Sequence, residues 1–160
     1  MMKKNTCLLC FILCVTLLAG CAPKSNMPGK VSWEMTAEQV TQTVGKDKVQ
    51  QGSSESILNQ MLTKDYADLY GDRTVSLAYV FSKEDKLSSI TVQVFANESE
   101  SIEEAMKNTR TVMEKTYGKG SVADSETHWH TKESAIGMQK IEGTADFFVV
   151  IYQPITAHSH

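Results

Sequence analysis

The sequence predicts an α+β domain, in which an antiparallel sheet carries two helices on one face and is built from two αβββ units. Two segments, residues 36–95 and 101–153, each begin with a capped helix and continue into strands. Inside the first segment, two apolar runs with alternating polarity are separated by five polar residues, which indicates a β-hairpin. Two such units joined edge to edge would form one sheet with both helices packed on the same side.

The N-terminus has the layout of a secretory signal. Two lysines precede an apolar run from Cys7 to Leu18, and small residues follow. This run is too short for a membrane-spanning helix, which needs about 20 apolar residues. The sequence therefore predicts a signal peptide over residues 1–20.

The end of this signal, Leu18-Ala19-Gly20-Cys21, resembles the lipobox of bacterial lipoproteins. The resemblance implies cleavage before Cys21 and lipidation of its thiol, so that the membrane is reached through this lipid. The protein would then lie in the cell envelope, on the extracytoplasmic face of a plasma membrane or an outer membrane. The alternative is an ordinary secretion signal with a chance cysteine.

Composition limits what the mature domain can be. Without residues 1–20, 140 of the 160 residues remain, enough for one domain with a real core. The formal charge is −3 for the whole chain and −5 without the two leader lysines, so no basic surface for nucleic acid is expected. Three of the four cysteines, Cys7, Cys10 and Cys14, lie in the signal, which leaves the domain without a disulfide or a cysteine nucleophile.

Residues 21–31 contain two prolines and a glycine without apolar periodicity, and they are expected to be a lipidated tether. A single domain is expected over residues 32–156, followed by a frayed tail at 157–160. The first helix is expected after Thr36, because Thr36 and Gln39 form a capping box. Ala37, Val40 and Val44 then share a face, and Gly45 ends the helix.

The rest of the first unit is a polar loop over residues 46–56, an ambiguous stretch over 57–70 and a hairpin. In the ambiguous stretch the apolar spacing suits a helical turn, but the β-rich sequence that follows favours a strand near 60–64 and then a turn at Gly71-Asp72. The two hairpin strands are expected at 74–81 and 87–95.

The second unit begins with another capping box, Ser101 with Glu104. One face of the helix that follows is apolar over four turns, through Ile102, Ala105, Met106, Thr109, Met113 and Tyr117. Gly118 ends this helix, and three further strands are expected at 127–131, 134–141 and 145–153.

Several motifs of this domain resemble those of small bacterial lipoproteins, among them the small lipoprotein component of the outer-membrane β-barrel assembly machinery. The similar motifs are Met35-Thr36-x-Glu38-Gln39-Val40 with Gly45, Leu77-x-Tyr79-x-Phe81 followed by Lys86-Leu87, and Tyr117-Gly118 before Trp129. Glu34 replaces the glycine that usually precedes the methionine. The resemblance implies a fold like that of β-lactamase inhibitory protein, and a function in protein binding without catalysis.

No catalytic motif of the kinds G-x-S-x-G, H-E-x-x-H or paired cysteine and histidine is present, so no enzyme and no cofactor are expected. An alternative is a metal or small-ligand site on His128 and His130, which would point to one face of a strand. Such a site needs more ligands, which His158 and His160 of the tail could supply. Otherwise the two histidines form an exposed polar face beside a core tryptophan, Trp129.

The last strand provides the clearest functional hypothesis, because it is apolar on both faces. The helices can cover only one of these faces. The other is a candidate surface for an envelope protein partner, expected to carry Phe95, His128, His130, Phe148 and Tyr152. The alternative is that Phe148 and its neighbours are core residues shielded by a loop or the tail.

Overall fold

The computed structural model describes residues 26–123 and 125–155. The signal peptide, Cys21 and the tail at 157–160 lie outside the described residues. The helices are the 3₁₀ helix η1 (Pro28–Lys30), α1 (Ala37–Val44), α2 (Ala67–Tyr70) and α3 (Ile102–Tyr117). The strands are β1 (Val49–Gln51), β2 (Ile57–Thr63), β3 (Val75–Phe81), β4 (Leu87–Phe95), β5 (Ser121–Ala123), β6 (Glu126–His130), β7 (Ser134–Lys140) and β8 (Phe147–Pro154).

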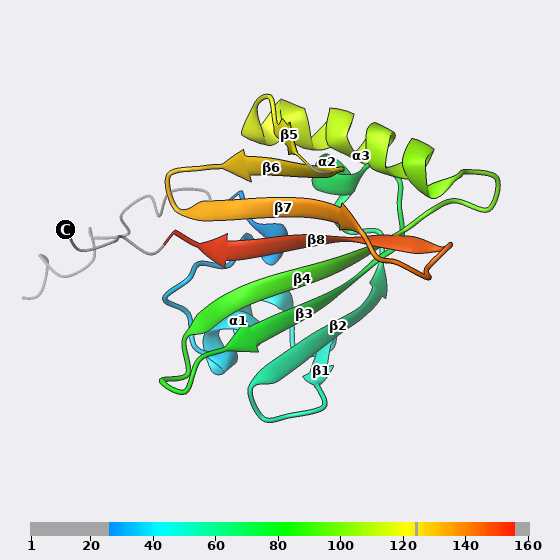
Figure 1. Cartoon of the computed structure of the whole chain (residues 1–160). Coiled ribbons are helices and arrows are strands. Elements are labelled where there is room, and N and C mark those ends of the chain that lie inside the picture. The colour runs from blue at the N-terminus through cyan, green and yellow to red at the C-terminus, as the bar shows by residue number, and fades with distance from the viewer. Residues whose placement is uncertain (1–25, 124, 156–160) are drawn as a thin grey trace, which may run out of the picture.

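The eight strands form one antiparallel sheet in the order β1-β2-β3-β4-β8-β7-β6-β5 (Figure 1). Each half of the sheet is a meander, and the halves meet where β4 pairs with β8. The predicted α+β class and the antiparallel sheet are confirmed. Each half has four strands where three were expected.

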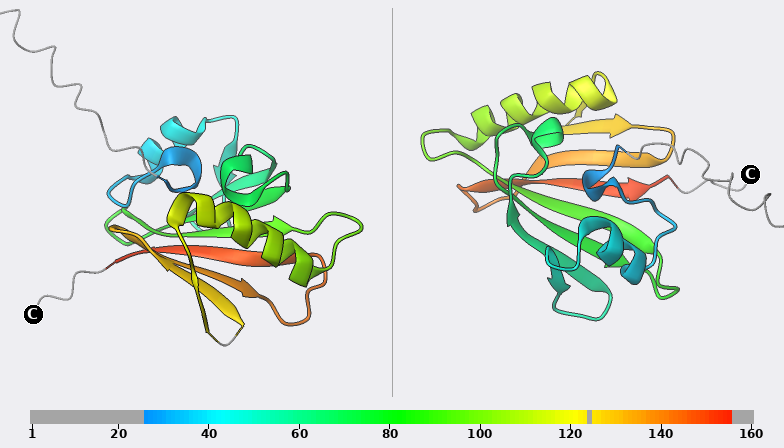
Figure 2. Two further views of the ribbon diagram at one scale, coloured as in Figure 1. Left: turned by 90° about the horizontal axis from the view of Figure 1, so that it is seen from above. Right: turned by 180° about the vertical axis from the view of Figure 1, so that it is seen from behind.

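The helices form a second layer. Both views in Figure 2 place α1, α2 and α3 on the same side of the sheet. The core between the layers contains fully buried aromatic residues from both halves, including Tyr70, Tyr79, Phe148 and Tyr152. None of the helices in the described part of the chain covers the opposite side of the sheet, which is called the open face from here on.

Both predicted capping boxes are present. The Thr36 hydroxyl accepts a hydrogen bond from the Gln39 backbone N–H, and the Ser101 hydroxyl accepts one from that of Glu104. In each case the side chain of the third helical residue accepts a hydrogen bond from the backbone N–H of the cap. Of the face predicted for α3, Ile102, Ala105, Thr109 and Met113 are buried, and Met106 and Tyr117 pack against the core.

Four short elements were not predicted. The 3₁₀ helix η1 lies in the expected tether, β1 in the expected polar loop and β5 in the loop after α3. The helix α2 lies in the ambiguous stretch, directly before the expected turn at Gly71-Asp72. Each spans only three or four residues. A segment of this length shows too little periodicity to be recognised, and it is held by its neighbours in the fold.

The N-terminal segment corrects the predicted boundary between tether and domain. Met27 and Val31, expected in the tether, are core residues with exposed fractions of 8% and 0%. The Trp33 indole N–H lies 3.0 Å from the Glu133 carbonyl oxygen and also 3.0 Å from the Ser134 hydroxyl, both in the second half. The folded part therefore includes residues 26–31, because this segment packs on the helical layer instead of extending from it.

Candidate interaction surface on the open face

Strand register decides which side chains reach the open face, because residues that pair across neighbouring antiparallel strands point to the same side. In β4, Ile90, Val92 and Val94 are fully buried under the helices. The residues between them therefore point to the open face. Register then assigns one open-face row that crosses five strands, namely Ala78, Thr91, Ile151, Gly137 and His128.

The central part of the open face carries no charged side chain. On the four central strands β3, β4, β8 and β7, the residues assigned to this face are Ser76, Ala78, Val80, Ser89, Thr91, Gln93, Phe95, Phe147, Val149, Ile151, Gln153, Ala135, Gly137 and Gln139. Charged residues make up 22% of the chain. Depletion of charge is the compositional signal of the centre of a protein interface.

Two phenylalanines form an aromatic pair at one end of this surface. Phe95 and Phe147 are cross-strand partners whose ring centroids lie 5.7 Å apart, at an interplanar angle of 50°. Both rings are only partly buried. Val149, the next residue on the same face of β8, is 5% exposed because it lies among the surrounding side chains. The surface thus offers apolar area that a partner could cover.

Phe148 and Tyr152 are not on the open face, which corrects the predicted composition of the surface. Both have an exposed fraction of 0% and lie under the helices. The Tyr152 hydroxyl shares a hydrogen bond of 2.8 Å with the Tyr70 hydroxyl of α2. Burial raises the pKa of both tyrosines well above its usual value, so both stay protonated. These residues belong to the core.

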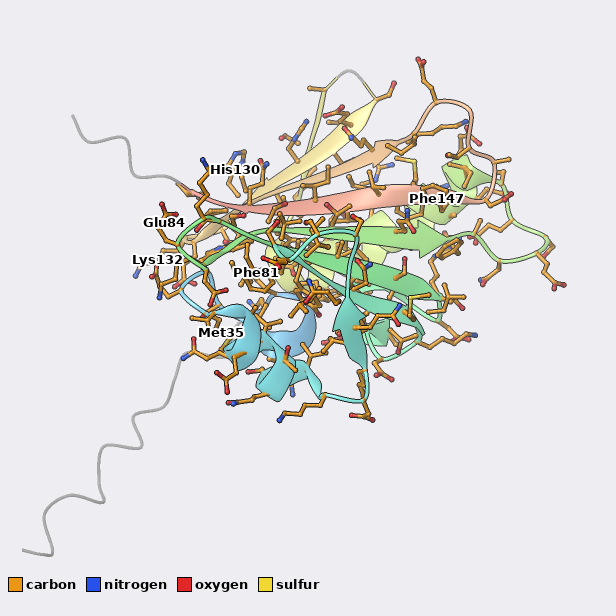
Figure 3. The ribbon with its side chains drawn as sticks, turned by 90° about the horizontal axis from the view of Figure 1, so that it is seen from below. Met35, Phe81, Glu84, His130, Lys132 and Phe147 are labelled. Atoms are coloured by element: carbon orange, nitrogen blue, oxygen red, sulfur yellow. The ribbon has the colours of Figure 1, made fainter. Side chains whose placement is uncertain are left out.

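The predicted histidines do lie on the open face, but the structure does not gather all the predicted residues in one place. Figure 3 shows His130 at one end of the sheet and Phe147, the partner of Phe95, at the other. His128 has its Nε2 atom 3.3 Å from a carboxylate oxygen of Glu126. Across residues 26–123 and 125–155, no group of three His, Cys, Asp or Glu side chains is arranged to hold a metal ion. The tail histidines lie outside the described residues.

Both edges of the sheet are short. The strands β1 and β5 have three residues each. Short edge strands offer few free backbone groups for pairing with another chain. The geometry therefore favours contact across the open face over addition of a strand at an edge.

The prediction missed that Phe147, Val149 and Ile151 are the residues of β8 on the open face, where Phe147 and Ile151 are partly exposed and Val149 is buried among its neighbours. The sequence showed that β8 is apolar on both sides, but the choice between its two faces depends on its register with β4. Phe95 pairs with Phe147, which puts the odd-numbered residues of β8 on the open face. A sequence alone carries the alternation but not this pairing.

No helix within the described part of the chain is long and apolar enough to cross a bilayer. No known family model matches the chain, and neither a curated protein nor a solved structure is significantly similar to it.

Proposed function

We propose that this chain is a lipid-anchored, non-enzymatic interaction module of the bacterial cell envelope, which binds a protein partner through the open face. The observation that carries the proposal is the absence of charge from that face over the four central strands. An uncharged surface with partly exposed phenylalanines can be desolvated at low cost when a partner covers it.

Two further features support the proposal. The lipobox-like end of the signal supports an anchor on Cys21. Each half of the fold is a helix followed by a four-stranded meander, and this arrangement supports a relationship to the β-lactamase inhibitory protein fold. Fold alone does not define a partner, so the interaction itself needs a direct test.

Thr91→Arg is expected to abolish capture of the partner. Thr91 lies in the middle of the open face, between Ala78 and Ile151. An arginine there would place an unpaired charge in the centre of the contact, which costs several kcal/mol in an interface, on the order of 3. The measurement is in-cell cross-linking of the full chain followed by mass spectrometry.

Thr111→Arg is the matched control, because Thr111 is an exposed residue of α3 on the helical side. It should capture the same envelope protein as the unmodified chain, and both variants should retain their thermal unfolding midpoint within a few degrees. If Thr91→Arg captures the partner as well as Thr111→Arg does, binding through the open face is excluded.

Cys21→Ser is expected to remove all fatty-acid label from the protein and to release it from the membrane fraction, because a serine hydroxyl does not replace the thiol in lipidation. The measurement is metabolic labelling with a radioactive fatty acid followed by fractionation. Fatty-acid label retained on the serine variant would show that the lipid is not attached through Cys21.

A further inference from the structure

A cavity on the helical side, remote from the open face, has the features of a ligand site. Its volume is about 860 Å³, within the range typical of small-molecule pockets. Its walls come from the N-terminal segment, the end of α1, the loop before β1, β2 and α2. Segments distant in sequence thus build one cavity.

The buried polar group in this cavity is the carboxamide of Gln60, a residue of β2 that is 2% exposed. Its Oε1 atom accepts hydrogen bonds from the hydroxyls of Tyr66, at 2.6 Å, and Tyr79, at 3.2 Å. Its Nε2 atom donates to no acceptor in the described part of the protein. This Nε2 atom is not fully enclosed, because among the described residues the only enclosed side-chain nitrogen or oxygen without a hydrogen-bond partner is the Thr109 hydroxyl. A group that enters the cavity can therefore accept a hydrogen bond from the Gln60 amide.

The rim of the cavity contains both signs of charge. Lys48 and Asp65 form an ion pair of 2.7 Å, and each side chain is about half exposed, at 47% and 49%. The ammonium group has three donors and the carboxylate several lone pairs, so both can bind a ligand while paired. Lys30 and Asp68 add one further charge of each sign to the lining.

Close packing holds the N-terminal wall in place. Gly29 has a φ of +76°, and a Cβ at this position would lie 2.8 Å from the Tyr79 hydroxyl oxygen and 3.1 Å from Val44 Cγ2. No larger residue could bring the backbone so near to the tyrosine at this backbone conformation. The wall therefore lies directly beside the hydroxyls that orient Gln60.

From these observations we propose that the cavity binds a short zwitterionic peptide. The Gln60 amide would donate to a peptide carbonyl oxygen, Lys48 would bind the terminal carboxylate, and the acidic lining residues would bind the terminal ammonium group. The site does not depend on the open face, so a failure here would leave the proposed partner surface unaffected, and the reverse also holds.

The test uses triglycine as the probe and isothermal titration calorimetry of the full chain in detergent. Saturable binding with a Kd of about 1 mM or lower is expected. Gln60→Glu should weaken triglycine binding at least about tenfold. This variant keeps a side-chain oxygen that accepts from the hydroxyls of both tyrosines, but it removes the amide N–H donor. The matched control is Gln93→Glu on the open face, where Gln93 is exposed, and it should bind triglycine like the unmodified chain.

A second pair of variants separates the role of Lys48 from a general effect of charge. Lys48→Met should weaken binding by a similar factor, whereas Lys140→Met should have no effect. Lys140 is an appropriate control because it forms an ion pair of the same length, 2.7 Å, with Glu103 and has a similar exposure of 48%.

Three outcomes would overturn the proposal. The first is no saturable heat up to about 10 mM triglycine, a concentration well above the Kd expected. The second is equal affinity in all four variants. The third is binding of an uncharged saccharide, maltotriose, at least as tightly as triglycine, which would show that the charged rim does not select a zwitterion.

Discussion

Phe148→Asp is expected to unfold the protein, whereas Phe147→Asp, one position earlier on β8, is expected to leave it folded. Phe148 is fully buried under the helices, so the aspartate would place an unpaired charge in the core and remove a large aromatic side chain. The expected cost is at least about 4 kcal/mol, a large part of the stability of a typical domain.

Phe147 is the control for this change because it lies on the open face. Its replacement would lose the ring contact with Phe95, which is worth about 1 kcal/mol, and would expose a charge that water can solvate. Thermal unfolding followed by circular dichroism compares the two variants. A folded Phe148→Asp or an unfolded Phe147→Asp would show that the faces of β8 are assigned the wrong way round.

Removal of either Arg73 or Glu100 alone is expected to destabilise the domain by about 3 kcal/mol, because the remaining partner would be a buried, uncompensated charge. The side chains are only 5% and 13% exposed. Both Nη atoms of Arg73 donate to the Glu100 carboxylate, Nη2 at 2.6 Å, and the Asn108 amide donates a third hydrogen bond to it at 2.8 Å. The pair joins the loop before β3 to the loop before α3, and thus one half of the fold to the other.

This ion pair should also make the free energy of unfolding depend on pH in the acidic range. The hydrogen bonds from Arg73 lower the pKa of Glu100 from 4.5 to about 2. Because the pKa of Glu100 is lower in the folded state than in the unfolded state, the contribution of its ion pair to the free energy of unfolding is fully present above pH 4.5. It is lost as the pH falls from there towards 2.

Urea unfolding of the unmodified chain and of Arg73→Met/Glu100→Met at pH 7, 4 and 2.5 measures this dependence. The double variant should lose less stability between pH 7 and pH 2.5 than the unmodified chain does, by about 3 kcal/mol or less. The exposed pair of Lys140 and Glu103 is the control, and its removal should leave the acid dependence of unfolding almost unchanged. Equal acid dependence in the unmodified chain and the double variant would contradict the role given to Glu100.

The sequence predicted those parts of the fold that depend on local interactions. Capping boxes at Thr36 and Ser101 involve residues three positions apart, and the β3–β4 hairpin depends on two alternating runs joined by a short loop. Each of these signals lies within one continuous stretch of the sequence. For the same reason, the longest elements, α3 and β4, agree best with their predicted bounds.

The features that could not be predicted depend on contacts between distant segments. The burial of Met27 and Val31 requires the helical layer on which they pack, and nothing in their immediate sequence indicates it. The composition of the open face requires the register between β4 and β8, where a shift of one residue exchanges the two faces. The cavity around Gln60 joins at least four segments, so its residues share no motif.

The packed N-terminal segment has a mechanical consequence for a protein held by a lipid on Cys21. The described fold begins at Asn26, only five positions after that cysteine. Five residues extend at most about 17 Å, little more than the radius of gyration of about 14 Å expected for a domain of this size. The domain would then be confined to a thin layer above the lipid headgroups, where it meets proteins of the same membrane at a high local concentration. A partner in the opposite membrane, or one whose binding site projects far from the surface, would lie beyond its reach.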